Sequence, residues 1–392
     1  MEKACNLAKN NTRNYSLDLL RCIAMIMVVI LHFLDKGGLL KDFSDGSSFT
    51  VQDVTAWIME ALCIVAVNLY MLLSGYLLCE SRFKVSNLIL LVCRVWLYSV
   101  IVGFIGIALD TPNEPVDTYF LLRLLFPISM GTYWFMTAYI FFYLLVPVLG
   151  IAARSLNKKQ LQIVLAGLIF FHAVIKSAVP ATLTADAGGM DMIWYVVLYF
   201  VAVYIRKYAK EIKFAFIWYL IATLLIFGEA FVLRQVFLRT GSLSYILNIS
   251  YAYNHIFVLA SSVFLFMAFL KLKVSEKPGK IFAFLGKYSL GVYLLHENLS
   301  VRYAWEKLFR CDKISSAILL VIMTIIAGIT VFVACVIVDF IGRTIASFVL
   351  KIFGKLPGFS SIGSAVKKAD LIFSKTSEEK IIHDTSKFSD GE

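Results

Sequence analysis

Charged side chains are scarce in this chain: Asp, Glu, Lys and Arg together make up 16% of its 392 residues. An ordinary soluble domain carries roughly 25% charged residues and roughly 45–50% apolar ones, whereas 60% of this chain is apolar. The composition therefore excludes a water-soluble fold. Apolar runs recur from Leu17 to Ile341 with no polar block large enough to fold separately, so we expect one integral membrane domain over residues 17–341. We expect residues 1–16 to be a cytoplasmic segment and the polar residues 342–392 to be a disordered cytoplasmic tail.

The sequence also lacks the short motifs of the commonest cofactor and metal sites. It has no P-loop, no Gly-rich dinucleotide loop, no H-E-x-x-H pair and no EF-hand loop. None of its seven cysteines forms a C-x-x-C pair. We therefore expect no metal, and we interpret the cysteines as small buried apolar residues. The formal net charge of +11 does not indicate nucleic-acid binding, because the basic residues lie mostly in short loops between apolar runs.

Apolar segments of membrane-spanning length dominate what is present. A helix needs about 20 mainly apolar residues to cross the hydrocarbon layer. Residues 119–130, broken by Pro127, predict an interfacial or re-entrant piece. The fold class we predict is all-α and polytopic, with about ten transmembrane helices over 17–35, 55–79, 87–109, 132–152, 161–178, 192–205, 214–233, 245–270, 281–299 and 315–341.

The charges of the loops predict the orientation of these helices. Lys and Arg accumulate in short loops on the cytoplasmic side of a membrane. With the N-terminus inside, the predicted inner loops are rich in cations and the first outer loops carry acids such as Asp42 and Asp110. Two outer loops fit less well, because they contain Arg234 and the mixed segment 302–313. Ten spans place both termini in the cytoplasm of a multi-pass protein, which we expect in the cell membrane.

Two ionisable residues share one face of the first predicted helix. Arg21 and His32 are eleven residues apart, almost three full turns, and the rise between them is about 16 Å. Asp18 lies one turn before Arg21, where it can neutralise or steer the guanidinium. Ionisable groups at membrane depth are functional candidates by default. The alternatives are that Arg21 is an anchor at the membrane surface and that His32 is a structural, hydrogen-bonded histidine.

Five sequence blocks resemble a known family, in the same order along the chain. The run SLDLLRCIAMIMVVILH (16–32) resembles the opening helix of the membrane-bound acyltransferase-3 family, in which an arginine and a histidine are separated by ten residues. The other four blocks are NLYMLLSGYLL (68–78), VCRVWLYS (92–99), WFMTAYIFFYLLVPVL (134–149) and LGKYSLGVYLLH (285–296).

The resemblance implies transfer of an acyl group, usually acetyl from acetyl-CoA, to a hydroxyl or amine of a sugar or surface polymer across the membrane. We expect His32 to act on the acceptor, as a general base or through an acyl-histidine, and we favour the base. We expect the acyl-CoA phosphates near Arg21, Arg94 and the inner-loop cations, with Asp18 beside Arg21. Family members often carry a second basic residue near the position of Arg94; here the partner stays open among Arg82, Lys84 and Asn87.

For the acceptor side, His296 is our second choice after His32, as an acceptor-binding or orienting residue, with a structural hydrogen bond as the alternative. His296 and Glu297 are adjacent, so on a helix they point about 100° apart and cannot both line one site equally. Four more side chains could supply oxyanion donors or a stacking surface for a sugar, against a core role for each: Asn68, Ser74, Tyr133 and Trp134. Four ionisable residues match no family motif and are interpreted as packing or cavity residues: Glu60, His172, Glu229 and His255.

The main prediction is therefore a membrane acyltransferase that uses acyl-CoA and acts on a surface polysaccharide, glycan or glycolipid. A homo-oligomer is left open. A transporter or flippase for a polysaccharide or a lipid-linked sugar is the alternative, but it has no evident need for a base that activates acyl transfer. A membrane sensing module is a third interpretation, which the short polar tail argues against.

Overall fold

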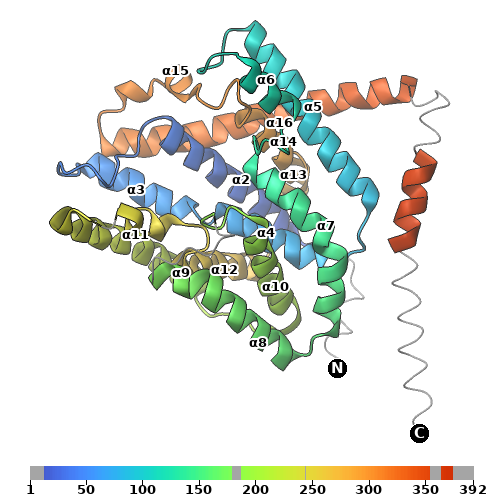
Figure 1. The fold of residues 1–392 in the computed structure, drawn as a ribbon, viewed down its shortest axis with the longest axis horizontal. Coiled ribbons are helices and arrows are strands. Elements are labelled where there is room, and N and C mark those ends of the chain that lie inside the picture. Colours follow the sequence, from blue (N-terminus) through green and yellow to red (C-terminus); the bar gives the residue numbers. More distant parts are fainter. Residues whose placement is uncertain (1–12, 179–186, 243, 354–362, 374–392) are drawn as a thin grey trace.

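The computed structural model describes residues 13–178, 187–242, 244–353 and 363–373, and within these ranges the chain is helical with no strand. Figure 1 shows the arrangement of the helices. In chain order they are α2 (Tyr15–Lys36), α3 (Val51–Cys63), α4 (Ala66–Leu78), α5 (Val85–Ala108), α6 (Thr118–Leu125), α7 (Trp134–Ser155), α8 (Lys158–Ile169), α9 (Ile175–Ala178), α10 (Met192–Tyr208), α11 (Ala215–Thr240), α12 (Ile256–Lys271), α13 (Glu276–Gly286), α14 (Ser289–His296), α15 (Trp305–Phe309) and α16 (Ala317–Phe353).

The predicted fold class, an all-α polytopic membrane protein, is confirmed. Eight helical stretches of the described chain are long and apolar enough to cross a membrane: Tyr15–Lys36, Val51–Leu78, Val85–Ala108, Trp134–Ser155, Lys158–Ala178, Ala215–Thr240, Ser244–Lys271 and Ala317–Phe348. The other two expected spans are shorter helices. The segment 192–205 corresponds to α10, which has 17 residues, and 281–299 is divided between α13 and α14. The expected interfacial piece, 119–130, contains the short helix α6.

The predicted boundary at residue 342 falls inside a helix. Apolar residues such as Ile345 and Phe348 continue the pattern of α16 beyond the boundary, and the helix runs on to Phe353. Residues 363–373 are also helical. The backbone N–H of Ser86 donates to Asp370 at 3.1 Å, so this short helix packs against the start of α5. These two parts of the tail are therefore ordered, and the rest of it, like residues 1–12, lies outside the described residues.

Helix α2 lies inside the bundle, where it packs against α3, α4, α12, α13, α14 and α16. Its first turn is fixed by Asn14, whose side chain accepts a hydrogen bond from the backbone N–H of Ser16. Next to it, α4 packs closely on α10 at Gly75, where a Cβ would lie 2.9 Å from the Cβ of Ala202. Helix α4 also contacts α2, and both helices contribute residues to the wall of one cavity.

Two arginines of the poorly fitting outer loops have structural roles. Arg234 donates from Nη2 to the backbone carbonyls of Asp45 at 2.7 Å and Ser47 at 2.8 Å. Arg302 donates to the carbonyls of Thr132 at 2.9 Å and Glu297 at 3.0 Å. Both cations therefore serve tertiary contacts, which explains why they depart from the loop-charge pattern.

Candidate active site

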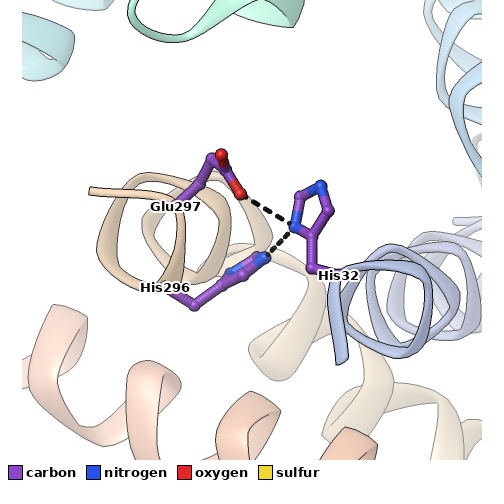
Figure 2. A group of neighbouring side chains, drawn as sticks. All are labelled: His32, His296 and Glu297. Atoms are coloured by element: carbon purple, nitrogen blue, oxygen red, sulfur yellow. Dashed lines mark hydrogen bonds and ion pairs between the residues drawn. The ribbon is translucent and has the colours of Figure 1, made fainter. Parts of the chain in front are cut away.

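His32 meets the end of α14 in the interior of the bundle, as Figure 2 shows. The Nδ1 atom of His32 lies 2.9 Å from Nε2 of His296 and 3.0 Å from Oε2 of Glu297. The side chain of His32 is 18% exposed, and that of Glu297 is 7% exposed. His32 thus forms one centre with two residues that follow it in the sequence by 264 and 265 positions.

The hydrogen bonds of this centre define which nitrogen of His32 carries a proton. Nδ1 of His296 lies 2.6 Å from the carbonyl oxygen of Val292, so it must donate, and Nε2 of neutral His296 is then an acceptor. Nδ1 of His32 therefore faces two acceptors, that nitrogen and the Glu297 carboxylate, and must be the protonated one. In the neutral ring this leaves Nε2 of His32 with a free lone pair, the form that a general base requires.

Glu297 is held in place by two cations as well as by His32. Nζ of Lys36 lies 2.5 Å from both carboxylate oxygens, and Nη2 of Arg302 lies 3.3 Å from Oε1. Lys36 follows His32 by four residues, so both project from one face of α2. The carboxylate is thus fixed between one imidazole and two positive charges.

The expectation that His296 and Glu297 cannot both line one site equally is wrong at His32, because both contact its Nδ1. Helix α14 ends at His296, and Glu297 leaves the helix with φ −96° and ψ 5°. The 100° rule holds only inside a helix, so the change of backbone direction lets both side chains face α2. Tyr133 supports this end of α14, because its hydroxyl lies 3.2 Å from the carbonyl of Leu294 and accepts from Asn298 at 3.0 Å.

A cavity of about 220 Å³ lies beside His32. Among its lining residues His32 is the one with an acidic or basic side chain, and the others are apolar, aromatic or hydroxyl-bearing. The ring of His32 therefore faces a cavity inside the bundle. The lining consists of Met25, Val28, Leu31, His32, Val67, Tyr70, Ser74, Leu91, Trp134, Phe135, Met136, Tyr139, Tyr253, Ser289, Leu290 and Tyr293.

Two of the predicted acceptor-side residues, Trp134 and Ser74, line this cavity. The indole of Trp134 stacks on the ring of Tyr253 with centroids 5.6 Å apart and planes at 27°. Asn68 has a structural role instead: it donates to the carbonyl of Tyr253 at 2.8 Å and accepts from Nε1 of Trp194 at 2.9 Å.

The predicted donor-side residues lie apart from the His32 centre. Arg21 is at the start of α2, where its guanidinium lies 3.5 Å from Asp18, while Asp18 also pairs with Arg13 at 2.6 Å. Arg94 lies on α5 and is half-buried, within electrostatic range of Asp339 and Arg343 of α16. The cation that lies within electrostatic range of Arg94 is therefore Arg343, which was not among the candidates drawn from the sequence.

Two further residues that were left as packing residues pair with each other. His255 and Glu229 lie 3.2 Å apart, and the His255 side chain is fully buried. This pair is separate from the cavity lining.

The donor atoms of His32, His296 and Glu297 all lie within 4.8 Å of one another, as in sites that bind a metal ion. Two observations argue against that use. Lys36 and Arg302 already neutralise the carboxylate, and Nδ1 of His32 is the protonated nitrogen by the hydrogen-bond argument above. A cation bound at this point would face three positive or proton-bearing groups, so the arrangement suits proton transfer better.

The bundle of helices long and apolar enough to span a membrane, with the His32–Glu297 pair beside a cavity, defines a polytopic membrane protein with a candidate site for proton transfer. Its family follows from sequence comparison: the acyltransferase-3 model, described as an acyltransferase domain, matches residues 14–339. The match covers most of the chain, so the chain belongs to this family and is a membrane acyltransferase. No curated protein and no solved structure matches it.

Proposed function

We propose that the protein transfers an acetyl or other short acyl group from acyl-CoA to a hydroxyl of a cell-surface polysaccharide, glycan or glycolipid, with His32 as general base. The observation that carries this proposal is the free Nε2 of His32, fixed by the contacts of Nδ1 with His296 and Glu297. Acyl transfer needs a base at the attacking hydroxyl, whereas a transporter has no evident need for a base that activates acyl transfer.

In the proposed reaction, Nε2 of His32 takes the proton of the acceptor hydroxyl as its oxygen attacks the thioester carbonyl carbon. The new C–O bond forms a tetrahedral intermediate, whose collapse breaks the C–S bond. The imidazolium then returns its proton to the departing thiolate, which gives the ester and free coenzyme A. The carboxylate of Glu297, 3.0 Å from Nδ1, stabilises the transient positive charge on the ring.

The cavity provides a place for both substrates next to the base. Its apolar and aromatic wall suits the uncharged pantetheine arm of the donor. The stacked rings of Trp134 and Tyr253 offer a flat surface for a sugar, and the hydroxyl of Ser74 is one of the available oxyanion donors. Arg21, about 16 Å of helix rise below His32, is at a distance suited to the phosphate end of the donor, with Arg94 as a second cation.

The test is acylation of the surface glycan, measured by mass spectrometry in cells that lack the protein and receive it back as wild type or as a variant. His32→Ala should lower acylation at least 100-fold at equal membrane levels, within the usual contribution of a general base, 10²–10⁴-fold. His172→Ala is the matched control, because His172 is a partly buried histidine of the spanning segment Lys158–Ala178 outside the cavity lining. Equal acylation by wild type and His32→Ala would refute the mechanism.

A further inference from the structure

A second charged cluster lies between α5 and α16, two helices that cross in the view of Figure 1, because Tyr98 of α5 contacts Asp339 of α16. Its centre is Asp339, whose side chain is fully buried. Asp339 accepts hydrogen bonds from the hydroxyl of Tyr98 and from Nε of Arg343 at 2.9 Å and Nη2 at 2.5 Å. Gly291 of α14 packs directly on this carboxylate and leaves no room for a Cβ.

The cluster carries more positive than negative charge. Arg94 and Arg343 both lie within electrostatic range of the single carboxylate of Asp339. Asp339 is already engaged by two nitrogens of Arg343. Arg94 forms no hydrogen bond or ion pair with any residue that the structure describes. A half-buried guanidinium in a spanning helix is costly without an anion, so the cluster lacks one negative charge.

The position of the cluster links it to the donor side of the cavity. Arg94 follows Leu91 by three residues on α5, and Leu91 lines the cavity. The guanidinium of Arg343 lies over the ring of Tyr288, 4.7 Å from its centroid, and the next residue, Ser289, also lines the cavity. The side chain of Arg21 contacts the same joint between α13 and α14, at Gly286. Arg21 and Arg343 thus both lie against the segment 286–288, and Arg94 lies within electrostatic range of Arg343.

We propose that Arg343, together with Arg94, binds a phosphate of the acyl-CoA donor, and that Asp339 and Tyr98 are positioning residues that aim Arg343. The inference rests on the proposed function and adds to it a phosphate-binding residue from the last helix. Arg343 binds Asp339 through Nε and Nη2, which leaves the N–H groups of Nη1 for a phosphate oxygen. The donor's phosphate supplies the missing negative charge.

The experiment compares two donors with the purified protein in lipid nanodiscs: acetyl-CoA, and acetyl-pantetheine, which has the same thioester and no phosphate. For each variant the measured quantity is a ratio: kcat/KM for acetyl-CoA divided by kcat/KM for acetyl-pantetheine. Arg343→Ala and Arg94→Ala should each lower this ratio at least tenfold, as expected for loss of a charge-assisted hydrogen bond. Arg343→Lys should lower it less, because a charge remains.

The ratio separates a phosphate-binding role from a general defect in folding, since misfolding lowers the rates with both donors equally. Arg94→Ala removes no hydrogen bond or ion pair among the residues that the structure describes, so it tests the inference even if Arg343→Ala is unstable. The control is Lys280→Ala, an exposed cation paired with Glu276, which should leave the ratio unchanged. Unchanged ratios in both arginine variants would overturn the inference. A wild-type protein that uses neither donor would instead overturn the proposed function.

Discussion

Substitution of Glu297 by glutamine tests whether a negative charge beside His32 accelerates acyl transfer. The amide oxygen of glutamine can still accept a hydrogen bond from Nδ1 of His32, so the substitution removes the charge and keeps the orientation of the ring. Coulomb attraction between unit charges at the observed 3.0 Å is about 5 kcal/mol at an effective dielectric constant of about 20. Partial wetting of the His32 ring reduces this, and we expect a loss of about 2–4 kcal/mol in transition-state stabilisation.

Such a loss corresponds to a fall in kcat of about 30- to 1,000-fold. The assay is the initial rate of acetyl transfer by the purified protein at saturating acetyl-CoA and fixed pH. We expect the KM for acetyl-CoA to change little, because the arginines proposed to bind its phosphates lie apart from the His32 centre. The matched control is Glu211→Gln on the loop between α10 and α11, whose side chain is 77% exposed.

The variant also leaves Lys36 and Arg302 without their carboxylate, so some loss of stability is expected. The melting temperature must therefore be measured beside the rate, and the rate compared only where the protein is folded. A folded Glu297→Gln protein with kcat within threefold of wild type would show that the carboxylate does not stabilise charge on His32, and the assignment of the pair to proton transfer would fail.

Two other substitutions give distinct outcomes. Arg21→Ala should raise the KM for acetyl-CoA about tenfold with little change in kcat, as measured by initial rates; an unchanged donor affinity would reassign Arg21 to anchoring at the membrane surface. Gly291→Ala should lower the melting temperature, because overpacking against Asp339 costs about 1–3 kcal/mol. The control is Gly167→Ala on α8, where a Cβ meets no neighbour within 4 Å; it should leave the melting temperature unchanged or raise it. Equal melting temperatures for the two variants would contradict the packing argument.

The sequence was sufficient for the fold class and for the shared face of Arg21 and His32, because both depend on local rules. Apolar runs of spanning length become helices in a membrane, and the spacing of eleven residues is a property of one helix. The pairing of His32 with His296 and Glu297 depends on tertiary packing between segments 264 residues apart. No sequence pattern that we considered predicts the contact between His32 and the end of α14.

Glu297 was set aside at the sequence level for a physical reason that failed locally. The argument assumed that a helix continues past His296, yet α14 stops there without a following glycine or proline to signal the end. The available signal was an acidic residue at membrane depth, which needs a partner. Arg343 was missed because it lies just beyond the predicted end of the last span, although its spacing of four residues from Asp339 is that of a helical ion pair.

The two ends of α14 connect the proposed donor site with the proposed base. At its start, Arg343 lies over the ring of the capping residue Tyr288, and the first helical residue, Ser289, lines the cavity. At its end, His296 and the capping residue Glu297 contact His32. A helix of eight residues is about 12 Å long, so a rigid element of fixed length separates the phosphate-binding level from the level of chemistry. Because one added residue would rotate the end of the helix by about 100°, the length of α14 sets both the reach required of the donor's arm and the direction in which the histidine and the carboxylate face α2.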